Sequence, residues 1–156
     1  MTSAYSDAGR AVPFDELACP LDGGALVDAG GSWQCSHGHN FDVARQGYLH
    51  LLPVQKKRSR EPGDSKAMVV ARQRFLAAGH YAPVAQAICD AVLAGLASRQ
   101  RVSILDAGCG EGYYLRQLVA AAQDSPCLAA LGLDISKWAV QCAARQDHNM
   151  RWVVGS

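Results

Sequence analysis

Apolar residues recur at two different spacings in the second half of the chain. Between residues 66 and 96 they recur every three or four positions, which predicts two amphipathic helices, at 66–78 and 81–96. After residue 100, short apolar runs at 102–106, 128–134 and 150–154 alternate with two helical patterns. Strands that alternate with helices are typical of consecutive βαβ units, so this part of the chain predicts a right-handed parallel sheet.

The first half of the chain carries little of this periodicity. Residues 1–13 are small and polar, which predicts a flexible tail. Residues 14–52 are rich in turns, and a segment of that size cannot bury a sufficient core without a metal or disulfides. Residues 53–66 contain proline and glycine and are expected to form a connector. The remaining residues, 67–156, are expected to form a partial α/β domain.

The turn after the first predicted strand of the α/β part is rich in glycine: Gly108, Gly110 and Gly112. Glycine permits positive φ and close approach of a ligand, and the helix start behind it offers unpaired N–H groups to an anion. The strand before the turn ends in Asp106, and the next strand ends in Asp134, where an acidic residue can bind ribose hydroxyls. The alternative is a plain turn in which Asp106 caps the helix.

The glycine spacing distinguishes between nucleotide ligands. The third glycine of the dinucleotide fingerprint would fall on Tyr113. The observed D-x-G-x-G-x-G instead resembles motif I of the S-adenosylmethionine (SAM)-dependent methyltransferases. The turn, both acids and the following helix therefore favour SAM as the cofactor.

Four residues of the 14–52 segment have the spacing of a zinc ribbon, C-x2-D-x12-C-x3-H: Cys19, Asp22, Cys35 and His39. An aspartate stands where a second cysteine is expected. Zinc accepts carboxylates beside cysteine and histidine, although a carboxylate is a harder ligand than a thiolate. His37 is a competing donor, and a ribbon that binds no metal is the other alternative.

The connector contains a cluster of basic residues: Lys56, Lys57, Arg58 and Arg60. Such a cluster is either a solvated loop or an arm that contacts phosphates. The formal net charge of the 156 residues is only +1, so overall charge does not indicate a nucleic-acid partner. No apolar run approaches the roughly 20 residues that span a bilayer. Six scattered cysteines suit a reducing cytoplasm better than a disulfide framework.

Together these motifs resemble the bacterial 23S rRNA guanine-N1 methyltransferases, which modify a guanine in a hairpin loop of the large-subunit RNA. The order of ribbon and basic connector is the most specific match. Matching pieces lie at 19–21, 35–39, 41–42, 47–48, 51–55, 57–60, 62–65, 75–76, 78–81 and 106–114. The resemblance implies Zn²⁺ and SAM as cofactors and a 23S rRNA hairpin as partner. It places the zinc ligands on Cys19, Asp22, Cys35 and His39, and SAM contacts on Tyr81, Tyr114 and Leu115.

We therefore expect an α/β protein in which a small zinc-ribbon β module precedes the first half of a Rossmann-like methyltransferase fold. Three strands and two intervening helices make half of a doubly wound sheet. We expect a truncated chain that lacks most of the target-base pocket and is inactive alone, and we name no catalytic base. A non-enzymatic zinc-ribbon RNA-binding fragment and a small-molecule methyltransferase are the alternatives, and a homodimer is left open.

Overall fold

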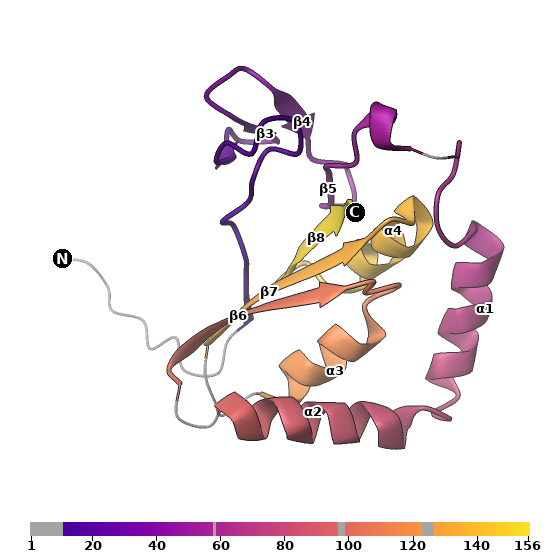
Figure 1. The fold of residues 1–156 in the computed structure, drawn as a ribbon. Helices are drawn as coiled ribbons and strands as arrows, with labels where there is room; N and C mark the ends of the chain where they lie inside the picture. The colour runs from indigo at the N-terminus through magenta and orange to yellow at the C-terminus, as the bar shows by residue number, and fades with distance from the viewer. Residues whose placement is uncertain (1–10, 58, 97–98, 123–126) are drawn as a thin grey trace.

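The computed structural model describes residues 11–57, 59–96, 99–122 and 127–156. It contains a five-stranded sheet, a three-stranded sheet and four α-helices within these residues (Figure 1). The five-stranded main sheet consists of β1 (Ala11–Pro13), β5 (Leu49–His50), β6 (Arg101–Ala107), β7 (Cys127–Asp134) and β8 (Arg151–Val154). The small sheet consists of β2 (Val27–Asp28), β3 (Ser32–Gln34) and β4 (Asn40–Asp42). The helices are α1 (Lys66–Ala77), α2 (Ala82–Leu96), α3 (Tyr113–Ala121) and α4 (Lys137–Gln146), with a 3₁₀ turn, η1 (Val54–Lys56).

All pairings in the main sheet are parallel, as the alternation of strands and helices predicts. Strand β7 is central. It pairs with β6 along one side, and with β1 and then β8 along the other. Strand β5 lies outside β8. Among the described residues β6 pairs only with β7, so its second edge is free.

The two faces of the main sheet have different cover. Helices α3 and α4 pack on one face, with a core of Leu115, Val140, Ala143, Ala144, Ala130, Trp152 and Val154. The other face meets the N-terminal module in a second cluster: Cys19, Leu26, Trp33, Cys35, Leu49, Leu131 and Val153. An apolar hollow of about 520 Å³ remains on this second face beside Leu105, which is 60% exposed.

Side-chain caps define the starts of two helices. The Ser65 hydroxyl accepts a hydrogen bond from the Met68 N–H at 3.3 Å and begins α1. The Ser136 hydroxyl accepts one from the Ala139 N–H at 3.2 Å and begins α4. Serine satisfies an otherwise unpaired N–H of the first turn. The cap at Ser65 confirms the helix start that the sequence predicts.

The structure corrects the expected boundaries of the N-terminal module. Residues 11–13, expected to belong to a flexible tail, form β1, because the free side of β7 offers them a parallel partner. Residues 49–50, expected to belong to the module, form β5 in the main sheet, where Leu49 is fully buried opposite Val153. The core of the module is therefore continuous with that of the main sheet. This continuity meets the need for burial that so short a segment cannot satisfy alone.

Gly132 is a packing constraint in the centre of the sheet. A Cβ there would overlap the Trp152 ring and lie 3.1 Å from the Cys109 sulfur. We expect Gly132→Ala to lower the free energy of unfolding by about 1–3 kcal/mol, the usual cost of overpacking a core. Gly95→Ala is the matched control, because the same added carbon meets no atom within 4 Å on α2. It should be neutral, or stabilising by at most about 0.5–1 kcal/mol. Urea unfolding followed by circular dichroism measures both, and equal effects would contradict this account.

Candidate functional site

Four side chains of the N-terminal module converge on one point: Cys19, Asp22, Cys35 and His39. One ligand atom from each lies within 4.8 Å of all the others. The Nδ1 atom of His39 lies 3.4 Å from the Cys19 sulfur and 3.3 Å from the Cys35 sulfur. The Asp22 Oδ2 atom lies 3.3 Å from the Cys35 sulfur and 3.0 Å from His39 Nδ1. The structure thus brings together the four residues that the spacing predicts.

The geometry and chemistry of this group fit Zn²⁺. Ligands bound at about 2.0–2.3 Å in a tetrahedron lie about 3.3–3.8 Å from one another, close to the observed separations. Both cysteines are buried and free of disulfides. The turn that brings His39 back to Cys35 uses Gly38 at a φ of 84° and is closed by the Gly38 N–H, which donates to the Cys35 carbonyl at 3.0 Å. Two thiols, an imidazole and a carboxylate are a donor set that zinc accepts.

Asp22 is held in place by its own loop. The Gly24 N–H donates to Asp22 Oδ1 at 2.8 Å, which leaves Oδ2 directed at the other donors. This hydrogen bond holds the pKa of the Asp22 carboxyl below its ordinary value. His37 approaches the same Oδ2 atom at 3.0 Å, but its side chain is 71% exposed and lies outside the four-residue group. The arrangement favours Asp22 over His37 as the fourth donor.

The glycine loop connects β6 to α3. Gly108, Gly110 and Gly112 all have positive φ, which requires glycine at these positions. A Cβ on Gly108 or Gly110 would meet no atom within 4 Å, so both face open space. A Cβ on Gly112 would overlap the Trp152 ring, so this glycine serves packing and not ligand approach. Gly112 is the N-cap residue of α3, and it provides no side-chain cap. The first turn of α3 contains no acidic residue.

Asp134 lies at the carboxyl end of β7 and binds two backbone groups. The Gly110 N–H donates to its Oδ2 atom at 2.9 Å, and the Ser136 N–H donates to its Oδ1 atom at 2.8 Å. The carboxylate therefore holds the glycine loop against the start of α4. Each carboxylate oxygen can accept a further hydrogen bond. Asp134 can thus fix the loop and still bind a hydroxyl group.

A hollow of about 300 Å³ lies between α2, α3 and the end of β6. Asp106 and Tyr114 line it together with apolar side chains of both helices. Burial, and then the negative charge of Asp134, raises the pKa of Asp106 above its ordinary value. Leu115 also lines the hollow, although its side chain is 98% buried in the core, so it can offer a ligand its backbone N–H. Tyr81 lies outside this lining, 42% exposed, with its ring edge-on to Phe75 at 5.4 Å.

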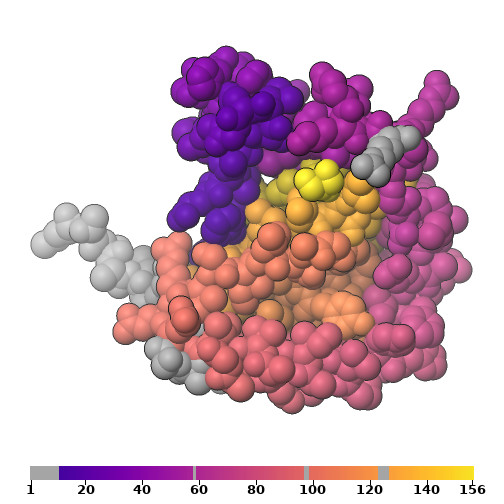
Figure 2. Space-filling view, in the orientation of Figure 1, coloured from indigo at the N-terminus to yellow at the C-terminus, as the bar shows by residue number. Residues whose placement is uncertain are grey.

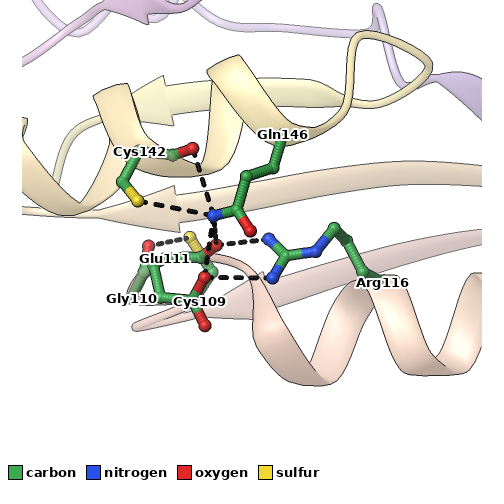
Figure 3. A network of polar contacts seen from close by, with 6 residues as sticks. All are labelled: Cys109, Gly110, Glu111, Arg116, Cys142 and Gln146. Carbon is green, nitrogen blue, oxygen red and sulfur yellow. Dashed lines mark hydrogen bonds and ion pairs between the residues drawn. The ribbon is translucent and has the colours of Figure 1, made fainter. Parts of the chain in front are cut away.

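A buried ionic network behind the loop escaped the sequence analysis (Figure 3). Glu111, only 3% exposed, accepts hydrogen bonds from Arg116 at 3.0 Å and from Gln146 at 2.9 Å through its Oε2 atom. Arg116 belongs to α3 and Gln146 to α4, so the network ties the loop to both helices. The only sequence signal of this network was an acidic residue inside a glycine turn. Its partner on α4 is 35 residues away, so no local pattern links the two.

The connector places its basic residues at the surface. Lys56 belongs to η1, while Lys57 and Arg60 line a groove beside α4. Arg58 lies outside the described residues. No helix of the described residues is long and apolar enough to cross a membrane.

Comparisons with known proteins agree with the resemblance that the sequence motifs indicate. A zinc-ribbon family model described as "RlmA, N-terminal" matches residues 17–60. The chain is 34% identical over 129 residues to the "23S rRNA (guanine(748)-N(1))-methyltransferase" of Streptomyces fradiae, covering 83% of this chain and 44% of that protein. Two proteins named "Putative 23S rRNA (guanine-N(1)-)-methyltransferase" are also similar. The one from Micromonospora griseorubida is 37% identical over 145 residues (83% of this chain, 47% of that protein). The one from Bacillus subtilis is 28% identical over 149 residues (93% and 51%).

These findings confirm the resemblance to 23S rRNA guanine-N1 methyltransferases over most of the chain. They also agree with the expected fold class, a zinc-ribbon module joined to a parallel α/β sheet. The chain spans about half the length of the curated relatives it matches.

The zinc group gives the first site prediction. Protein purified without chelators should contain about one zinc per chain by elemental analysis, because four donors already face one point. Asp22→Cys should tighten zinc binding in a chelator competition, because a thiolate is a softer ligand. Asp28→Cys is the matched control. Asp28 accepts a hydrogen bond from the N–H two residues on, as Asp22 does, but lies outside the donor group. Metal-free protein, or equal tightening by both variants, would contradict the assignment.

The raised pKa of Asp106 gives a pH-dependent prediction. The folded protein protonates this carboxyl at a higher pH than the unfolded chain does, so its contribution to stability falls as the pH rises through the raised pKa. Asp106→Asn should therefore raise Tm at pH 7, and the gain should shrink towards about pH 4, where the unfolded carboxyl is also protonated. Thermal unfolding across pH measures this, with the exposed Asp90→Asn on α2 as control. A gain that does not change with pH would show that charge is not its cause.

Proposed function

We propose that this chain supplies the zinc-ribbon and cofactor-binding parts of a SAM-dependent 23S rRNA guanine-N1 methyltransferase. One observation carries the proposal: the carboxylate of Asp134 holds an open glycine loop at the carboxyl ends of β6 and β7. Ligands of open parallel α/β sheets bind at this edge. The similarity to the rRNA methyltransferases, with the zinc-ribbon match on the same chain, supports a methyl donor over a dinucleotide.

The loop residues have different roles in binding the cofactor. Gly108 and Gly110 let the ligand approach the backbone, because no side chain occupies the space in front of them. The first N–H groups of α3, including those of Tyr114 and Leu115, face an anionic carboxylate favourably. Asp134 accepts hydrogen bonds from ribose hydroxyls, and Asp106 and Tyr114 wall the adjoining hollow. The family resemblance adds Tyr81, which immediately precedes α2 and lies outside the lining of the hollow. When bound, SAM supplies an electrophilic methyl group on a sulfonium.

The residues of this chain contribute to catalysis chiefly by positioning. Transfer to guanine N1 requires an aligned acceptor and removal of the N1 proton. Both oxygens of Asp134 bind backbone N–H groups, so this residue orients the loop and is not a free base. The zinc ribbon and the basic connector bind the RNA. Ribosomal RNA as the substrate implies a cytoplasmic protein.

SAM binding tests the cofactor half of this proposal. Asp134→Ala removes a charged acceptor and the bond that holds Gly110, each of which supports the site. Losing a hydrogen bond to a charged group costs about 1.5–3 kcal/mol, so the Kd should rise by a factor of about 10–150. Isothermal titration calorimetry with SAM measures this. Asp90→Ala removes an exposed carboxylate on α2 that accepts a hydrogen bond from Gln86, and it should leave the Kd unchanged.

Methyl transfer tests the reaction. The protein is incubated with SAM and a guanine-loop RNA hairpin, and primer extension then locates the modification. A methyl group on N1 blocks the pairing edge of guanine, so any transfer is read as a stop beside that base. Such a stop would support the proposed reaction and overturn the expectation that the chain is inactive alone. Modification at another atom would contradict the proposed guanine-N1 chemistry. A chain that binds no SAM would contradict the proposal as a whole.

A further inference from the structure

A basic groove lies between the connector and the start of α4. Its narrow end, about 40 Å³, is lined by His50, Lys57, Arg60, Glu61, Lys137 and Trp138, among others. Its wide end, about 470 Å³, includes Lys56 and shares Pro62 and Ile135 with the narrow end. In the space-filling view the C-terminal residues (yellow) lie in a recess below the N-terminal module (indigo) and the connector (purple) (Figure 2).

The connector is fastened to the start of α4. The buried Ser136 hydroxyl donates to the Asp64 carbonyl at 2.6 Å. Gly63 packs so closely that a Cβ there would lie 2.8 Å from Ile135 and 2.9 Å from Ser136. These contacts join segments about 70 residues apart, since Ser136 and Asp64 differ by 72 positions. They hold the basic residues of the connector opposite Lys137.

The groove concentrates positive charge in a chain of almost neutral net charge. Four cations line its two ends, Lys56, Lys57, Arg60 and Lys137, against one side-chain carboxylate, Glu61. None of the four takes part in an ion pair with a described residue. Burial and the charges of Lys57 and Lys137 lower the pKa of His50, which agrees with a positive field inside the groove. Uncompensated cations in a concave surface are suited to an anion.

An aromatic ring forms one wall of the groove. The ammonium groups of Lys66 and Lys137 lie 5.7 and 5.8 Å from the centre of the Trp138 ring. A partly exposed tryptophan flanked by cations is suited to single-stranded RNA, whose bases stack on aromatic rings while its phosphates contact the cations. Trp138 lies in the first turn of α4, four residues after Asp134, whose carboxylate holds Gly110 of the glycine loop.

We propose that this groove binds the substrate RNA beside the cofactor, with a backbone phosphate held by Lys57, Arg60 and Lys137 and an unpaired base stacked on Trp138. The proposal rests on the proposed function for the identity of the substrate. It adds Lys137 and Trp138, from the α/β part of the chain, to the RNA contacts that the sequence predicts in the connector. The groove thereby gives the RNA a path from the zinc ribbon to the methyl donor.

Salt-dependent RNA binding tests the cationic part. The probe is a fluorescein-labelled RNA hairpin, and fluorescence anisotropy gives its affinity over a series of salt concentrations. Lys137→Ala should weaken binding several-fold and reduce the slope of log K against log salt by about one phosphate contact. Arg101→Ala is the matched control, because it removes one positive charge from the exposed start of β6, at the other end of the strands. It should bind as the unchanged protein does.

A second variant tests the stacking wall. Trp138→Leu should weaken RNA binding about 5- to 150-fold, the effect of losing roughly 1–3 kcal/mol of base stacking. It should leave the salt slope unchanged, because no charge is lost. Circular dichroism checks that the variant is folded. If the variant is not folded, the comparison of Lys137→Ala with Arg101→Ala still decides the proposal.

The outcomes separate this inference from the proposed function. Equal affinities and slopes for Lys137→Ala and Arg101→Ala, with RNA binding intact, would overturn the groove and leave the methyltransferase proposal standing. If the unchanged protein binds no RNA while calorimetry shows SAM binding, both the RNA-binding groove and RNA as the substrate are contradicted. A lower slope for Lys137→Ala alone, with weaker binding by Trp138→Leu, is the expected result.

Discussion

The carboxylate of Asp134 is the junction on which the candidate site depends. One oxygen holds Gly110 and the other holds the Ser136 N–H. Ser136 in turn caps α4 and donates to Asp64 in the connector. Asp134 and Ser136 therefore fix the relative positions of the glycine loop, the last part of the connector and the helix that carries Lys137. Charge-assisted hydrogen bonds are among the stronger ones in proteins, which suits a junction that joins segments distant in sequence.

Close packing of the Trp152 ring in the core supports this junction. The ring of Trp152 fills the space left by the missing side chains of Gly112 and Gly132, and its indole N–H donates to the Asp147 carbonyl at 2.8 Å. A glycine in a ligand-binding loop is usually explained by ligand approach, but Gly112 is required by the Trp152 ring in the core. The same loop thus contains two glycines that leave space for a ligand and one that leaves space for the protein itself.

The sequence predicted those features that depend on a few neighbouring residues. The cap at Ser65, the turn of three glycines and the run of β7 each follow from local chemistry, and the structure contains them. Strand β5 could not be predicted, because two residues show no period and its place depends on Leu49 filling a core made by other strands. The contact between Glu111 and Gln146 was missed for the same reason, since no local pattern marks a partner on another helix.

The position of β5 also determines how the two parts of the chain are joined. Cys19 and Cys35, two of the four side chains of the candidate zinc group, lie in the same buried cluster as Leu49, Leu131 and Val153 of the main sheet. The ribbon is therefore packed against the sheet, and the connector leaves directly from β5 before it is fastened again at Ser136. Packing at one end and a hydrogen bond at the other restrict the motion of the connector more than that of a free linker. An RNA bound by the ribbon would thus meet the glycine loop in a defined orientation, and the proposed methyl transfer, which depends on positioning, requires such an orientation.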